Sequence, residues 1–295
     1  MRKPKGRRQP TPPRRTRKKR PASAIYVYCI GLQGDLSEYF TATLPDSLEP
    51  GSRLELVAAR SGKADNSQPV LAAVVSAVPL REYGRNELEV NLADPAWTAT
   101  RAIRHEKVVQ HFASVISVIP LRFGTLYLDR MRLGKMLRER TDDLLPVLER
   151  LRGREEWGVN VYFDASKLRA GILRSGHKTA GLENKAAAAS PGQSYLERKR
   201  IDSFRAREAR LEIGRVLDRI EDRLLGASDA AKRLRVLKME SGDQGRIVGR
   251  FAFLVRRRRF EHFQAAARNQ LKSLQTAGFS LELTGPWPAY NFIQP

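Results

Sequence analysis

The sequence predicts an α+β protein made of two domains. Residues 157–284 are predicted to run strand, helix, strand, strand, helix, strand, which is the order of the ferredoxin-like (βαββαβ) fold. The helices of this fold lie on one face of an antiparallel sheet, so the other face is expected to be free. The preceding part is predicted to run strand, strand, strand, helix, strand, a smaller variant of the same class with an antiparallel sheet and helices. The length of 295 residues, 41% of them hydrophobic, is enough for about two domains of ~150 residues with a core each.

The strands of the first domain are rich in β-branched and aromatic residues and are expected at residues 25–30, 54–59 and 70–78. A helix is expected to follow Asp94, because Asp is a good N-cap and Pro95 is favoured at the first helical position. This helix should reach about Ser114. Residues 115–121 then predict a strand, which Pro120 restricts to an edge or a bulge.

A long helix over residues 130–151 leads into the second domain, with leucines on one face and a kink or a split expected at Pro146. The later strands are expected at residues 157–163, 234–239, 246–255 and 279–283. Two further amphipathic helices are expected at residues 194–225 and 260–274. Glycines at residues 241–245 predict a hairpin loop, and the polar residues 174–193 predict a flexible or weakly helical insertion.

These patterns divide the chain into four parts. They are a disordered basic arm (1–23), an N-terminal α+β domain (24–128), a C-terminal ferredoxin-like domain (129–284) and an aromatic, proline-containing tail (285–295). Residues 1–21 hold 11 Lys and Arg and no acidic residue, half of the net charge of +22. Like-charge repulsion and prolines oppose regular structure there. The arm is therefore either a solubilising extension or a contact for nucleic acid or another acidic partner.

Several classes of protein are excluded by composition. Cys29 is the only cysteine, so no internal disulfide and no multi-cysteine zinc site is expected, which suits a reducing cytoplasm. No apolar run reaches the ~18 residues that span a bilayer, so no membrane association is expected. The basic start lacks a following apolar segment, so a secretory signal is not expected either.

No catalytic, cofactor-binding or metal-binding set is predicted. His105-Glu106 begins like a zinc-protease motif, but Val109 stands where the second histidine is needed. The histidines are therefore expected on helix surfaces. Cys29 lies in an apolar strand with no base nearby, where thiols are usually inert.

A nucleic-acid site is the alternative that the charges leave open. The four arginines from Arg256 to Arg259 lie between a strand and a helix and could grip phosphate. Phe251 and Phe253 precede them at a spacing of two residues. These rings either form a base-stacking platform or pack as core against the helices.

Three segments together resemble the gas vesicle protein F/L family. They are Pro-Leu-Arg-Phe-Gly-Thr at 120–125, Arg-Glu-Glu-Trp-Gly-Val continuing to Val-Tyr at 154–162, and Gly-Pro-Trp-Pro-Ala-Tyr-Asn-Phe at 285–292. Residues 104–108 and 194–199 are similar to family segments in the expected order. The resemblance runs from about residue 24 to the C-terminus, so it leaves out the basic arm. The chain departs from the family at Ala289, often a second proline, and at Pro146, in a helix that is usually uninterrupted.

The resemblance implies a two-domain α+β accessory or minor structural protein of gas vesicles, the gas-filled protein organelles that give cells buoyancy. It also implies a role in shell assembly, with the major shell protein and other accessory proteins as partners, and no catalytic residues or cofactor. Arg122 and Phe123 are candidates for partner contact or for structural packing. Trp287, Tyr290 and Phe292 are expected either to pack across the two domains or to dock to another subunit.

Overall fold

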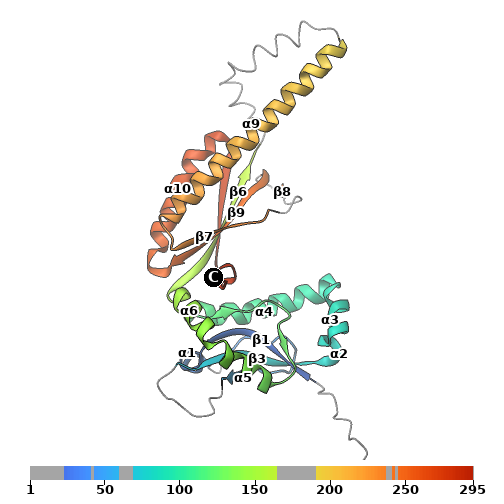
Figure 1. Cartoon of the computed structure of the whole chain (residues 1–295), viewed down its shortest axis with the longest axis vertical. Helices are drawn as coiled ribbons and strands as arrows, with labels where there is room; N and C mark the ends of the chain where they lie inside the picture. The colour runs from blue at the N-terminus through green and yellow to red at the C-terminus, as the bar shows by residue number, and fades with distance from the viewer. Residues whose placement is uncertain are drawn as a thin grey trace, which may run out of the picture.

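The computed structural model describes residues 23–40, 43–59, 69–164, 191–236, 241–242 and 245–294. These residues form two sheets of five strands each, which lie one after the other along the long axis of the molecule (Figure 1). The last residues of the chain return to the junction between the sheets. The predicted α+β class, with antiparallel sheets and helices, is confirmed.

The N-terminal sheet is built around two long strands. Its strands are β1 (Ser23–Leu32), β2 (Glu55–Ala58), β3 (Leu71–Pro79), β4 (Ile119–Pro120) and β5 (Leu126–Tyr127). Their order is β2-β3-β1-β4, and β5 also pairs with β1. β1 and β3 run antiparallel, with Val27 opposite Val75 and Leu32 opposite Leu71.

Helices cover both faces of this sheet. The helices of the N-terminal half are α1 (Gln33–Tyr39), α2 (Leu80–Tyr83), α3 (Arg85–Leu92), α4 (Pro95–Val115), α5 (Arg130–Glu139) and α6 (Thr141–Leu151). On one face Phe112 of α4 packs in a cluster with Tyr26 and Tyr28, and on the other Leu133 of α5 packs in a cluster with Val27. Successive residues of β1 are therefore buried on opposite faces, which explains its uninterrupted apolar run.

The C-terminal sheet has the predicted ferredoxin-like order of elements. Its strands are β6 (Arg154–Phe163), β7 (Ala230–Leu234), β8 (Ser241–Gly242), β9 (Gly245–Arg256) and β10 (Phe279–Trp287), and its helices are α9 (Pro191–Leu225) and α10 (Phe260–Leu274). The order β10-β6-β9-β7, antiparallel throughout, puts the first and third strands at the centre and the other two at the edges. β8 pairs with the start of β9.

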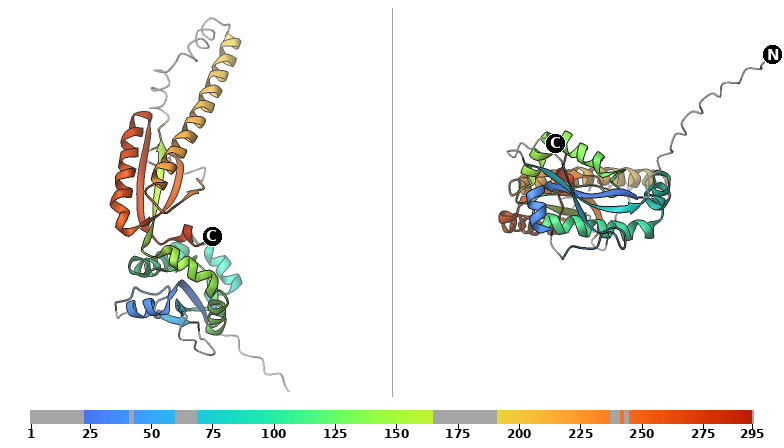
Figure 2. Two further views of the ribbon diagram at one scale, coloured as in Figure 1. Left: turned by 60° about the vertical axis from the view of Figure 1, so that its left-hand side comes forward. Right: turned by 90° about the horizontal axis from the view of Figure 1, so that it is seen from below.

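α9 and α10 cover one face of the C-terminal sheet. Val159, Phe251 and Phe253 point to this face and pack with Ile220 of α9 and Phe263 of α10. α9 then continues beyond the sheet as a single straight helix (Figures 1 and 2).

The opposite face of this sheet was expected to be open, and it is covered where it meets the N-terminal half. There Ala252 and Leu254 share a core cluster with Leu148 of α6 and with Phe292 from the end of the chain. The expectation is wrong at this end, because the C-terminal residues turn back onto the sheet.

The helix start after Asp94 is confirmed, but the elements that follow differ from the prediction. Asp94 Oδ1 accepts a hydrogen bond from the N–H of Ala96 at 2.9 Å. α4 continues through Val115, so the predicted strand 115–121 is reduced to Ile119–Pro120. A short apolar run does not distinguish a helix end from a buried strand.

The predicted helix 130–151 is divided at Arg140 rather than kinked at Pro146. Asp142 and Asp143 occupy the first turn of α6, where acidic side chains favour a helix N-terminus. Pro146 remains inside the new helix, as its sixth residue.

Other boundaries differ. The helices α1, α2 and α3 and strand β5 were not predicted; they have 7, 4, 8 and 2 residues and are too short for a clear periodicity. β7 occupies residues 230–234, earlier than the predicted strand 234–239, and β10 continues to Trp287, into the predicted tail. The arm up to residue 22, residues 174–190 of the predicted insertion and residues 243–244 of the hairpin loop lie outside the described residues. Residues 191–193 of that insertion begin α9.

Candidate functional site

The C-terminal residues form a bridge between the two sheets. After β10 they enter a short 3-10 helix, η3 (Tyr290–Phe292). Phe292 is 4% exposed in the cluster beneath α6, and Arg150 Nη2 donates to its carbonyl oxygen at 2.5 Å. Gly285 permits this path, because its φ is +126° and a Cβ there would lie 3.0 Å from the carbonyl oxygen of Glu156.

Two carboxylates, one from each half, hold the bridge. Tyr290 Oη donates to Glu106 Oε2 of α4 at 3.0 Å. The N–H and Nδ2 of Asn291 donate to the two oxygens of Glu156 on β6 at 2.9 and 2.5 Å. Burial raises the pKa of both carboxyl groups, and these hydrogen bonds oppose that rise. The tail is therefore tied to both sheets by polar contacts as well as by Phe292.

His105 lies at the centre of a buried hydrogen-bond network beside this bridge. The N–H of Gly124 donates to Tyr26 Oη at 3.2 Å, which directs the hydroxyl proton of Tyr26 to His105 Nδ1 at 2.9 Å. His105 Nε2 then carries the ring proton, facing the carbonyl oxygen of Leu121 at 3.1 Å and Tyr290 Oη at 3.2 Å. Burial lowers the pKa of His105 to about 4, so the ring is neutral at pH 7.

The expectation that the histidines lie on helix surfaces is wrong for His105, which is 2% exposed. Its partners come from strands and loops far away in the sequence, so a helical pattern could not reveal them. Within the described residues no group of three or more His, Cys, Asp or Glu side chains could hold a metal ion. Cys29 is buried, and burial raises the pKa of its thiol, which keeps it protonated.

The loop 120–125 is part of the same network. Gly124 has a φ of +86°, which turns its N–H towards Tyr26. The ring of Phe123 lies 6.2 Å from that of Tyr26 and 5.9 Å from that of His105, so Phe123 packs on the network. Arg122 is exposed, with only its carbonyl oxygen engaged, by Thr125.

The five candidate contact residues therefore fall into two groups. Phe123, Tyr290 and Phe292 are packed or hydrogen-bonded inside the molecule. Arg122 and Trp287 present their side chains to solvent; Trp287 is 46% exposed. Trp287 Nε1 donates to Thr284 Oγ1 at 3.2 Å.

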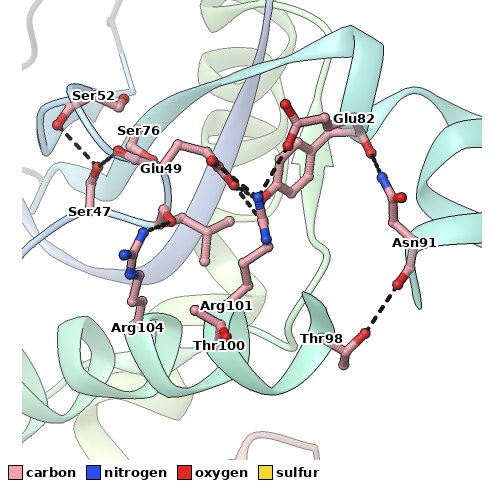
Figure 3. Close-up of polar contacts among 12 residues, drawn as sticks. Ser47, Glu49, Ser52, Ser76, Glu82, Asn91, Thr98, Thr100, Arg101 and Arg104 are labelled. Atoms are coloured by element: carbon pink, nitrogen blue, oxygen red, sulfur yellow. Dashed lines mark hydrogen bonds and ion pairs between the residues drawn. The ribbon is translucent and has the colours of Figure 1, made fainter. Parts of the chain in front are cut away.

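A second polar cluster, which the sequence did not reveal, lies at the other end of α4 (Figure 3). Arg101 Nε donates to Glu49 Oε1 at 2.7 Å, and its Nη2 donates to Glu82 Oε2 at 3.1 Å. The guanidinium also lies 4.1 Å from the ring centre of Trp97, one helical turn earlier. Tyr83 donates a short hydrogen bond to Glu49, and burial raises the pKa of this phenol.

This cluster joins a loop and the helix α2 to α4. The spacing of Trp97 and Arg101 by four residues was the one signal in the sequence, since such residues share a helix face. The carboxylates come from distant segments and had no local pattern. Glu49, Glu82 and Tyr83 are each bonded to Arg101, so the cluster connects these segments of the backbone.

The run from Arg256 to Arg259 is engaged in part, and Arg258 and Arg259 are exposed. Arg256 Nε lies 2.9 Å from Asp229, and Arg257 is paired with Glu155 at 3.0 Å. Phe251 and Phe253 are buried against α9 and α10, so these rings pack as core and do not form a base-stacking platform. None of the helices in the described part of the chain is long and apolar enough to span a membrane.

A family model described as gas vesicle synthesis protein GvpL/GvpF matches residues 24–294 of the chain. The chain belongs to the GvpL/GvpF family. The resemblance carried by the three sequence segments is thus confirmed, and the chain is a gas vesicle protein by family. The GvpL/GvpF segments at 104–108, 120–125, 154–162 and 285–292 meet at the bridge described above.

Relatives and solved structures agree with this assignment to the GvpL/GvpF family. Gas vesicle protein L of Streptomyces sp. (strain CB03234) is 31% identical over 224 residues, which are 75% of this chain and 79% of that protein. Gas vesicle protein F of the same strain is 28% identical over 199 residues, 64% of this chain and 76% of that protein.

The fold matches two crystal structures of GvpF. The structure from Anabaena sp. PCC7120 has a TM-score of 0.61 at 15% identity and covers 92% of this chain and 97% of its own. The structure from Microcystis aeruginosa has a TM-score of 0.53 at 14% identity, with 92% and 99% covered. At these identities the likeness concerns the fold alone.

Proposed function

We propose that this GvpL/GvpF protein is a non-enzymatic accessory or minor structural protein that assists assembly of the gas vesicle shell by binding shell subunits. The observation that carries the proposal is the family match over residues 24–294, which spans both sheets and the bridge between them. Its partners are the major shell protein and other accessory proteins, and it acts in the cytoplasm where vesicles form.

The architecture supports a binding role. In the described residues Tyr290, Glu106 and His105 are hydrogen-bonded within the molecule, and burial keeps His105 neutral. Such a network fixes two sheets relative to each other and presents their outer surfaces to a partner. The division into domains at 24–128 and 129–284 stays a prediction; α5 and α6, assigned to the second domain, pack on the first sheet.

The test is co-purification of the full chain with co-expressed major shell protein under conditions in which vesicles assemble. We expect shell protein to be retained, and we expect cells that lack the chain to show fewer intact vesicles by electron microscopy. Absence of both effects would remove the proposal. Deletion of residues 1–21, which lie outside the family match, should leave shell binding unchanged.

The exposed candidates Arg122 and Trp287 are proposed as contact residues. Trp287→Ser and Arg122→Ser remove exposed side chains, so the fold should persist while retained shell protein falls. Met131→Ser is the matched control, because this residue is 82% exposed and is not a candidate. Equal retention by all three variants would remove both residues from the contact surface.

A further inference from the structure

The sheet edges in the described residues differ in how well they are protected. β2 has four residues and an ion pair between Arg130 and Glu55, and β4 and β5 have two residues each, with Pro120 among them. β7 has five residues and carries Lys232 and Arg233. Short length, proline and charge are the devices that stop an edge from pairing. β10 is nine residues long, its proline, Pro286, is its last residue but one, and it pairs only with β6 among the described strands.

The free edge of β10 presents backbone groups that suit another strand. The N–H of Asp164 donates to the carbonyl oxygen of Gly278, which makes these two residues a hydrogen-bonded pair in the register with β6. Because hydrogen-bonded pairs alternate in an antiparallel ladder, the N–H and C=O groups of Leu281 and Leu283 point away from β6. The outer edge of β10 therefore offers the N–H donors and C=O acceptors of these two residues to an added strand.

An apolar groove runs beside this edge, between β10 and α10. Its cavity measures about 130 Å³ and is bordered by Leu281 and Leu283 from the strand and by Ala267 and Leu271 from the helix. In the left view of Figure 2 the helix α10 lies alongside the sheet at this side. A strand added to β10 would point every second side chain into the groove.

The groove is bordered by one positively charged side chain without an ion-pair partner in the part of the chain that the structure describes. Arg268 of α10 lines it and is exposed, and no ion pair engages it within the described residues. Glu282, the acidic residue of the strand, is already bound on the opposite face by Asn160 and Tyr162. The groove is therefore apolar with an unneutralised positive rim, which is complementary to an apolar segment that carries a carboxylate.

From these observations we infer that an extended segment of the shell subunit adds as a strand to the free edge of β10. Its apolar side chains fill the groove against α10, and an acidic side chain pairs with Arg268. This inference rests on the proposed function and names the surface through which it works. Backbone pairing supplies affinity, and the groove and Arg268 supply selectivity.

The experiment uses the full chain co-expressed with the major shell protein. Arg268→Glu reverses the charge in the groove, and Lys272→Glu makes the same change on an exposed residue of α10 outside it. We expect Arg268→Glu to lower the amount of retained shell protein by about five- to tenfold and Lys272→Glu by less than about twofold. Both variants should keep the melting temperature of the parent chain, because both side chains are exposed.

A photo-crosslinker gives an independent readout of the same surface. Benzoylphenylalanine at Gln264, which lines the groove, should crosslink to the shell protein, whereas the same residue at the exposed Asn269 should not. Retention by the parent chain with equal effects of both charge reversals and no crosslink from position 264 would overturn the strand-addition inference and leave the proposed function in place. No retention by the parent chain would overturn the proposed function itself.

Discussion

Truncation of Phe292 to alanine tests whether the tail is a structural bridge. Phe292 is 4% exposed and shares its cluster with Leu148, Leu151 and Leu254, so the substitution leaves a cavity between the sheets. Buried Phe→Ala changes cost about 3–5 kcal/mol, and a position near the chain end belongs at the lower limit of ~3 kcal/mol. At 2–4 °C per kcal/mol for a chain of this size, the melting temperature should fall by roughly 6–12 °C.

The assay is thermal unfolding followed by circular dichroism, with Trp287→Ala as the matched control. Trp287 is a larger side chain in the same tail but is 46% exposed, so its loss should cost about 1 kcal/mol or less. Equal melting temperatures for Phe292→Ala and the parent chain would refute the bridge. A larger loss from Trp287→Ala than from Phe292→Ala would show that the tail packs differently.

Three further changes probe the same framework by unfolding measurements. Gly285→Ala should lose about 2 kcal/mol because the φ of +126° strains any L side chain, whereas Gly214→Ala, in open space on α9, should be neutral or stabilising. His105 has a folded pKa of about 4, against about 6.5 in the unfolded chain, so below pH 6.5 the unfolded chain binds more protons than the folded chain. The free energy of unfolding should therefore fall by about 3 kcal/mol as the pH drops from above 6.5 to 4. In urea titrations, His105→Gln should lack this dependence of the unfolding free energy on pH. Arg101→Met should cost about 2 kcal/mol by leaving the half-buried carboxylate of Glu49 without its arginine, and an unchanged urea midpoint would contradict this.

The C-terminal fold was predictable because its signals are local. Alternation in β10 and β6, a glycine-containing loop before β9 and apolar faces on α9 and α10 each act within one element. The N-terminal half was less predictable because its strands are buried on both faces and carry no alternation. Its short helices depend on tertiary contacts, such as the hydrogen bond from Arg101 to Glu82 of α2.

The candidate site was predictable only in part. The segments at 120–125 and 285–292 were identified by resemblance, but whether their side chains pack or face solvent depends on contacts across the whole chain. Tyr290 and Glu106 are separated by 184 residues, and Asn291 and Glu156 by 135. His105 could not be placed inside because Tyr26, its hydrogen-bond partner, lies 79 residues earlier.

Several polar groups of the family segments are turned inward, and this bears on where the chain contacts others. Hydrogen bonds within the molecule already engage Glu106, Glu156 and His105. Breaking these hydrogen bonds would leave buried polar groups unpaired. A shell subunit that bound through these groups would have to break the bridge. The outward groups of Leu281 and Leu283 are different, because a strand can satisfy them without disturbing any described contact. The bridge thus fixes the relative position of the sheets, and the free edge of β10 remains available for association.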